Sequence, residues 1–384
     1  MSKVKLCDIC DFQGGSQPPK SQWITLQQDG YIRMLQIRDF TQPGKVKEEY
    51  VKLTNTTKCC LKDDILIARY GASLGKILTG LSGAYNVAMT KAVPNEAVIS
   101  KKFLYYFLCS DTFQNCILNV GVRAAQAGFN KEDLSNIEIY CPDLSIQNKI
   151  CKILELVDVL INKSKLQLDE LDLLVKSRFI EMFGESNYPL VKACDVCDFI
   201  TKGTTPNTKE IYENYTDERI PFLKVYNLSN TGKLLFKNKT QYIDNSVHNG
   251  ELSRSIVFPN DVLMNIVGPP LGKFAIVDDS FPEWNVNQAI AIFRAKREIL
   301  PLYLLYSLMQ DDILSPFLQK AVGVRQLNIS LEQCRELQFR LPPLNLQHNF
   351  SVFAQQVDKS KLAIQQSLDE LETLKKSLMQ QYFG

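Results

Sequence analysis

The sequence is poor in histidine and tryptophan and has no long hydrophobic run. Among its 384 residues are 2 histidines and 2 tryptophans. No apolar stretch reaches the roughly 18 residues that a membrane-spanning helix needs, and residues 1–8 lack the apolar core of a secretory signal. We therefore expect a cytoplasmic protein whose 11 cysteines are reduced thiols.

The familiar motifs of catalysis are missing as well. No Gly-x-Ser-x-Gly occurs, no Gly-x-Gly-x-x-Gly opens a helix after a strand, and no Asn-Pro-Pro-aromatic motif of an amino-methyltransferase is present. Asp63 and Asp64 have no Glu-x-Lys downstream to complete a nuclease core. The sequence thus favours a binding protein over an enzyme, with no catalytic residue, no metal ligand and no cofactor of its own.

The net charge of +2 gives only a weak overall field, so any affinity for nucleic acid must come from local patches.

What the sequence does contain is an internal repeat. Residues 142–184 align with residues 342–384 at a shift of 200 without a gap, and Leu168-Asp169-Glu170-Leu171 recurs 200 residues later. In both copies apolar residues recur in alternating steps of four and three, which is the seam of a coiled coil. The predicted seam residues are Ile150, Leu154, Val157, Ile161, Leu168, Leu171, Val175, Phe350, Val357, Ile364, Leu368, Leu371 and Leu378.

Each copy predicts a long helix, and the simplest partner for its narrow apolar stripe is the other copy. The alternative is two core helices within one large globular domain. A run of about 35 residues is roughly three times the usual helix length, which favours a spacer or an assembly surface.

The repeat continues into the segments before each helix. Residues 4–12 match 191–199, a predicted strand at 34–39 lies over 222–227, and a strand, glycine turn and strand recur at 64–76 and 261–273. We also align Tyr85-Asn86-Val87 with Trp284-Asn285-Val286, and expect amphipathic helices around 103–117 and 302–317.

The predicted fold class is therefore α+β. Two tandem domains are separated and followed by long helices that pair as an antiparallel coiled coil, with an internal pseudo-twofold repeat. The expected boundaries are 1–142 for the first domain, 143–184 for the central helix, 185–342 for the second domain and 343–384 for the C-terminal helix.

Two repeated motifs have alternative interpretations. The Gly-x-x-Leu-Gly-Lys of each domain resembles a phosphate loop, but its glycines are one residue too close and no Ser or Thr follows the lysine, which favours a hairpin turn. Cys7/Cys10 and Cys194/Cys197 have the spacing of zinc half-sites, yet the pairs lie nearly 190 residues apart in apolar segments, which favours buried thiols.

Polar loop residues recur at matching positions of the two domains. Amide, hydroxyl and guanidinium groups suit the edges of DNA bases, although taken singly each residue is an ordinary solvated loop residue. The candidate DNA-binding residues are Gln17, Lys20, Arg69, Tyr70, Lys76, Arg123, Gln126, Lys202, Thr204, Thr205, Lys273, Asn285, Asn287, Gln288, Arg325 and Gln326.

Across nearly its whole length the pattern resembles the specificity subunits of type I restriction–modification systems. The resemblance rests on the domain–helix repeat, the repeated strand and glycine turn, the closing Phe-Gly, and the Pro-x-Leu-x-x-Gln that opens each helix at Pro142 and Pro342. Ile146 and Leu346 depart from it, because the family usually has Glu before that Gln.

The resemblance implies two target recognition domains, each reading one half of a bipartite site in double-stranded DNA. It implies helices that form a spacer and bind two methyltransferase subunits, joined by restriction subunits that translocate DNA with ATP. S-adenosylmethionine, ATP and Mg²⁺ would then bind those partners. Two other functions stay open: a coiled-coil adaptor that never touches DNA, and an enzyme that itself cuts or methylates DNA.

Overall fold

The computed structural model describes residues 3–121, 128–184, 187–268, 271–319 and 327–384. The chain forms two compact units, one of Met1–Lys165 with Gln366–Gly384 and the other of Leu166–Gln365. Each unit contains one α+β domain and a segment of both long helices. The expected domain boundaries follow the sequence repeat, whereas the compact units divide both helices near their middle, because each helix segment packs with the domain of its own unit.

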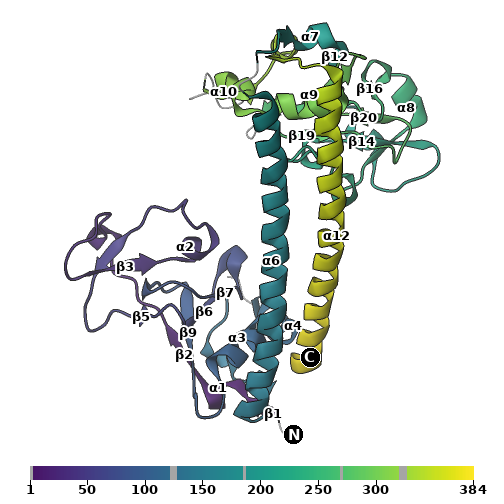
Figure 1. The fold of residues 1–384 in the computed structure, drawn as a ribbon. Coiled ribbons are helices and arrows are strands. Elements are labelled where there is room, and N and C mark those ends of the chain that lie inside the picture. The colour runs from purple at the N-terminus through teal and green to yellow at the C-terminus, as the bar shows by residue number, and fades with distance from the viewer. Residues whose placement is uncertain (1–2, 122–127, 185–186, 269–270, 320–326) are drawn as a thin grey trace. The chain divides into compact units, whose positions relative to one another are not determined.

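The two long helices predicted from the repeat are present. Helices α6 (Leu144–Phe183) and α12 (Leu344–Phe383) have 40 residues each. Within each unit their segments lie side by side and run in opposite directions (Figure 1), joined by Asp158–Lys375 at 2.6 Å in the first unit and by Asp172–Lys361 in the second. All thirteen predicted seam residues are buried or half-buried.

The first unit contains two four-stranded sheets and a two-stranded one. The strand orders are β2-β9-β6-β7, β4-β3-β8-β5 and β1-β10, and all pairs are antiparallel except β3 with β8. The strands are β1 (Lys3–Lys5), β2 (Cys10–Gly14), β3 (Tyr31–Leu35), β4 (Tyr50–Lys52), β5 (Cys59–Cys60), β6 (Ile65–Ala68), β7 (Ile77–Leu78), β8 (Gly83–Tyr85), β9 (Met89–Pro94) and β10 (Glu138–Tyr140). The helices before α6 are α1 (Leu6–Ile9), α2 (Ile37–Thr41), α3 (Lys101–Cys109), α4 (Asp111–Gly121) and α5 (Lys131–Leu134), with 3-10 turns η1 (Lys20–Gln22) and η2 (Gly71–Ser73).

The second unit repeats this plan with additions. Its strand orders are β12-β21-β17-β19, β13-β15-β14-β20-β16, β11-β23 and β18-β22, and β14 with β20 is the counterpart of the parallel pair. The strands are β11 (Leu190–Lys192), β12 (Cys197–Lys202), β13 (Ile211–Tyr212), β14 (Arg219–Leu223), β15 (Tyr242–Asp244), β16 (Ile256–Val257), β17 (Val262–Asn265), β18 (Val267–Gly268), β19 (Phe274–Ile276), β20 (Trp284–Val286), β21 (Ile290–Ala295), β22 (Leu327–Asn328) and β23 (Gln338–Arg340). The helices are α7 (Ala193–Val196), α8 (Asn245–Asn249), α9 (Pro301–Leu308), α10 (Asp311–Gln319) and α11 (Leu331–Arg335), with 3-10 turns η3 (Thr208–Glu210), η4 (Val225–Asn227), η5 (Phe236–Asn238) and η6 (Ser253–Ser255).

Two predicted elements are shorter in the structure than in the sequence pattern. The strands expected at 34–39 and 222–227 end at Leu35 and Leu223. In each case a side chain three residues on captures a backbone N–H and starts a helical turn: Gln36 N–H donates to the Asp39 carboxylate (2.8 Å) and Lys224 N–H to the Asn227 amide oxygen (2.9 Å).

The helices expected around 103–117 and 302–317 are each two helices in the structure. The first is broken at Ser110, whose hydroxyl donates to the Phe107 carbonyl (2.6 Å) and accepts from the Phe113 N–H (3.4 Å). A serine that satisfies both the last turn of α3 and the first turn of α4 favours a corner over a continuous helix.

The base of each long helix is fixed by a fully buried glutamine. Gln147 accepts from the Ser100 N–H (2.8 Å) and donates to the carbonyls of Val98 (2.8 Å) and Pro142 (2.7 Å). Two hundred residues later, Gln347 makes the same three bonds to Leu300, Glu298 and Pro342. Because Ser100 and Leu300 are the N-caps of α3 and α9, this amide attaches the first turn of each long helix to the domain before it.

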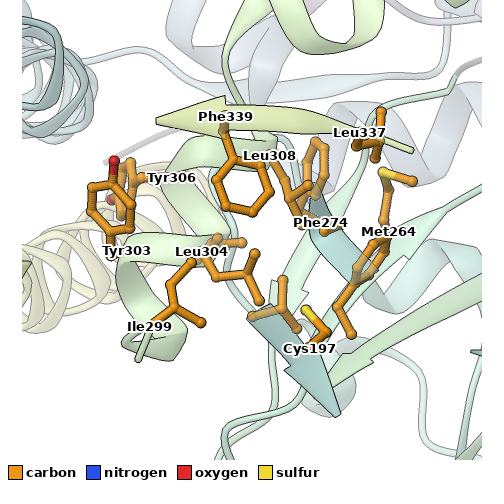
Figure 2. Packing of buried hydrophobic residues seen from close by; sticks show 14 of the residues in the cluster. Cys197, Met264, Phe274, Ile299, Tyr303, Leu304, Tyr306, Leu308, Leu337 and Phe339 are labelled. Carbon is orange, nitrogen blue, oxygen red and sulfur yellow. The ribbon is translucent and has the colours of Figure 1, made fainter. Parts of the chain in front are cut away.

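The last turn of each long helix completes a hydrophobic core. Phe383 of α12 packs in the first unit, with its ring 5.0 Å from that of Phe103, and Phe183 of α6 packs in the second, 5.0 Å from Tyr303. Figure 2 shows part of the second core, where Leu304 and Leu308 of α9 lie among side chains from the sheets. The first unit therefore contains both the beginning and the end of the chain.

We predict that Gln147→Leu lowers the free energy of unfolding of the first unit by about 2–4 kcal/mol, because one buried N–H and two carbonyls lose their partner. Chemical denaturation followed by circular dichroism measures this. The matched control is Asn148→Leu at the next, exposed position of the same helix and unit, which should change stability little. An equal effect of both substitutions would contradict a role for the buried amide.

We predict that Phe383→Ala lowers the free energy of unfolding of the first unit by about 3 kcal/mol, since it leaves a cavity beside Phe103 and Phe107. The second unit should be little affected. Hydrogen exchange read by mass spectrometry should show faster exchange in α3 and α4, with α9 and α10 unchanged. Gln381→Ala, at an exposed position two residues earlier, is the control. Faster exchange in α9 instead would show that the packing assignment is wrong.

Candidate nucleic-acid interface

In both units a glycine holds a loop in place. The loop follows β2 in the first unit and β12 in the second, and each of these strands lies at the edge of a four-stranded sheet. Gly15 N–H donates to the Met89 carbonyl (3.1 Å), and Gly203 N–H donates to the Ile290 carbonyl (3.0 Å). A Cβ on either glycine would overlap a backbone carbonyl oxygen, that of Asn86 in one unit and that of Val286 in the other. Only glycine lets the two chain segments approach so closely. We call this contact the glycine junction.

The junction corrects the alignment of the segment before it. β3 pairs Leu35 with Tyr85, and β14 pairs Leu223 with Val286. The next residues, Asn86 and Asn287, then donate their N–H groups to Leu35 and Leu223 respectively. Asn86 therefore corresponds to Asn287, two residues beyond the Asn285 that sequence similarity suggested, because hydrogen-bond register and not residue identity sets equivalence in a sheet.

The predicted residues of the first unit that the structure describes lie on the segment after the junction glycine, up to the start of η1, and on the β6–β7 turn. Gln17, Lys20, Tyr70 and Lys76 are exposed and Arg69 is half-buried. They differ in whether their polar groups already have partners within the protein. Lys20 forms an ion pair with the Glu49 carboxylate at 2.6 Å, whereas the Arg69 Nε donates to the Phe129 carbonyl at 3.3 Å, which occupies one of the five donors of that guanidinium.

In the second unit the structure brings several predicted residues together at the junction. Thr205 accepts from the Gln288 N–H (3.2 Å), which joins the loop after β12 to the turn after β20. Thr204 accepts from the Arg254 guanidinium (3.3 Å), which joins the same loop to η6. Lys202 precedes them and is exposed, whereas Lys273 is half-buried just before β19 and makes neither of these bonds.

Asn287, also half-buried, lies in the turn after β20. Its side-chain oxygen is buried and has no hydrogen-bond partner in the described part of the chain.

Asn285 does not lie at the surface. It is fully buried in β20, where its amide donates to His248 Nδ1 (2.6 Å) and accepts from the Ser255 hydroxyl (3.2 Å). The expected base contact by this side chain is therefore replaced by a structural role, because its amide NH₂ and its amide oxygen both bond to buried groups, in α8 and η6.

Four further candidates, Arg123, Gln126, Arg325 and Gln326, lie outside the described residues.

The structure shows the surroundings of the cysteine pairs and of Asp63 and Asp64. Burial raises the pKa of the Cys10 and Cys197 thiols to about 12, which disfavours the thiolate that binds zinc. Asp63 and Asp64 are both held by Lys101, at 2.8 and 3.3 Å. Within the ranges that the structure describes, no three His, Cys, Asp or Glu residues are grouped to hold a metal ion.

Sequence reasoning missed Arg254. It falls in residues 230–258, for which the first half of the chain has no counterpart in sequence, so no repeated pattern marked it. The lack of a counterpart was itself the available signal, because it marks residues that differ between two otherwise similar domains.

Comparison with known proteins gives the family. The model of the type I restriction modification DNA specificity domain matches residues 1–171 and again residues 185–373. The chain belongs to this family. Two copies of the specificity domain thus account for the duplicated fold, and each match includes one glycine junction.

Solved structures share the fold of this specificity protein. A chain from work on complex assembly and conformational transition of the type I R-M system has a TM-score of 0.60 and 17% identity, over 100% of this chain and 97% of that one. The S subunit of a type I restriction-modification system from M. genitalium has a TM-score of 0.54 and 15% identity, over 100% and 96%. In the described part of the specificity protein, no helix combines the length and apolar character needed to cross a membrane.

We predict that Gly15→Ala destabilises the first unit by about 3 kcal/mol, because backbone atoms and not a flexible side chain must move to admit the new methyl group. Gly14→Ala is the matched control, since its Cβ would have only an ordinary contact, 3.7 Å from Arg69 Nη1. Thermal unfolding of both variants measures the difference. Similar melting temperatures would contradict the close approach at Gly15.

Proposed function

We propose that this chain is a specificity subunit that reads a bipartite sequence in double-stranded DNA, one half-site through each domain. The observation that carries the proposal is the glycine junction, which recurs in both units with different polar side chains around it. A constant frame with variable hydroxyl, amide and cationic groups is what two related domains need to read unequal half-sites. The residues proposed to contact DNA are those of the two loop sets, with Asn285 assigned to the interior.

The long helices suit the second part of the proposal, a spacer and an assembly surface. At 1.5 Å per residue a 40-residue helix is about 60 Å long, while half-sites on one face of B-DNA lie about 34–36 Å apart. The base pairs between the half-sites would then be sensed only through phosphates or shape.

The outward faces of α6 support assembly with partners. Leu156, Leu166 and Leu173 are 61%, 57% and 63% exposed, although each is large and apolar. We propose that two methyltransferase subunits and the ATP-driven restriction subunits bind to the helices. The chemistry, with S-adenosylmethionine, ATP and Mg²⁺, would belong to those partners, and this chain would be non-catalytic and act in the cytoplasm.

The test is to co-express the chain with a type I methyltransferase subunit and to map methylated adenines in the host genome by single-molecule sequencing. We expect a split motif with two defined halves and a fixed gap. The chain expressed alone, incubated with DNA, Mg²⁺ and S-adenosylmethionine, should neither cut nor methylate. Activity of the chain alone would establish the enzyme alternative.

The same experiment separates the adaptor alternative. If the complex assembles and yet no sequence motif is methylated, the helices act as a scaffold without DNA readout. A single undivided motif would refute the assignment of one half-site to each domain.

A further inference from the structure

The segment that precedes one edge strand occupies the same place beside the glycine junction in both units. β5 pairs Cys59 with Ala84, and β16 pairs Ile256 with Asn285. Since Ala84 and Asn285 occupy equivalent positions opposite β3 and β14, Cys59 corresponds to Ile256. We call the residues just before this strand the pre-strand segment: residues 54–58 in the first unit and 253–255 in the second.

In both units the pre-strand segment is hydrogen-bonded to the hydroxyl that follows the junction glycine. Ser16 accepts from the backbone N–H of Lys58 at 2.9 Å, and Thr204 accepts from the Arg254 guanidinium at 3.3 Å. The acceptor is therefore constant, but the donor changes from a backbone group to a cationic side chain. The first unit presents threonines here, with Thr54 bonded to Thr56 (3.0 Å) and Thr57 (2.9 Å).

The backbone beneath Arg254 is fixed by a buried polar network. Ser255 donates to the Asn285 amide oxygen (3.2 Å), Asn285 donates to His248 Nδ1 (2.6 Å), and His248 Nε2 donates to the Glu283 carboxylate (3.0 Å). Ser255, Asn285 and His248 are fully buried. A satisfied network of this kind holds one conformation, so the residue next to Ser255 projects from a rigid base.

The guanidinium itself is available. Arg254 is exposed, and no carboxylate of the described residues forms an ion pair with it, whereas Arg219 and Arg294 are paired with Asp244 and Asp261. Its bond to Thr204 uses one Nη2 hydrogen and leaves the other donors of the planar fork free. Such a fork matches the O6 and N7 acceptors of guanine in the major groove.

We infer that the pre-strand segment determines specificity and that Arg254 reads a guanine in the half-site of the second domain. Thr204 and the Ser255–Asn285–His248 network act as positioning groups that aim the guanidinium. In the first domain the same place presents hydroxyls and Lys58, so the two half-sites differ in the base read there. This inference rests on the proposed DNA readout and names the residue that performs one part of it.

The experiment uses the assembled complex with its methyltransferase subunits and duplexes carrying the methylated motif. At one fixed salt concentration, fluorescence anisotropy gives Kd for the motif and for each single base-pair substitution. For the unchanged complex we expect one G·C pair in one half-site whose substitution weakens binding on the order of 10- to 100-fold. Arg254→Ala should abolish that discrimination and keep the penalties at all other positions.

Two further variants separate the effect of charge from that of the guanidinium geometry and provide a control. Arg254→Lys keeps the charge and loses the fork, so it should bind well and still fail to discriminate at that pair. Arg297→Ala is the matched control: it is an exposed arginine without an ion-pair partner among the described residues, at the opposite end of β21 from the junction. Melting temperatures of all variants confirm that folding is unchanged.

An unaltered discrimination profile for Arg254→Ala would overturn the inference. So would a uniform loss of affinity with unchanged ratios, which is the signature of a phosphate contact. Either result leaves the proposed function intact, because the unchanged complex would still read a split motif. Absence of any motif for the unchanged complex would instead refute the proposed function itself.

Discussion

The arrangement of each unit depends on one buried side-chain amide. Gln147 and Gln347 satisfy a backbone N–H and two carbonyls where a sheet, a short helix and a long helix meet. The bonds are buried or part-buried, and without the amide these backbone groups would lose a partner, which is costly where water is excluded. Because the amide bonds mainly to backbone atoms, with Cys141 Sγ at 3.5 Å as the one side-chain partner of Gln147 among the described residues, most side chains of the domain can vary without disturbing the base of the helix.

At the glycine junction, too, backbone contacts are constant while the side chains around them vary. Gly15 and Gly203 hold the chain by backbone bonds, and the residues that follow them, Ser16 and Thr204, offer a hydroxyl to a segment that differs between the units. Backbone hydrogen bonds thus hold this loop in place, and the polar side chains around it can differ between the two units. This division lets the surface side chains of the two units differ while the backbone contacts stay the same.

The sequence predicted the helices well and the small elements less well. The seam of α6 and α12 follows from a regular spacing sustained along the chain, a signal that depends on local periodicity alone. The breaks at Ser110 and after Leu35 depend on side chains that capture nearby backbone groups, and hydrophobic spacing does not register such bonds. The shift from Asn285 to Asn287 was invisible for a different reason: strand register is set by partners far away in the chain.

The amino-acid sequence by itself determined the duplication, the long helices and the family, since all three follow from residue spacing and from short motifs that occur twice. Only the tertiary structure decided which polar residues face outward. Asn285 and Gln288 are three residues apart and equally polar, yet one is buried in a network and the other is exposed at the junction. The reason is physical: burial of a polar group depends on whether distant segments supply its hydrogen-bond partners, and His248 and Ser255 do so for Asn285 alone.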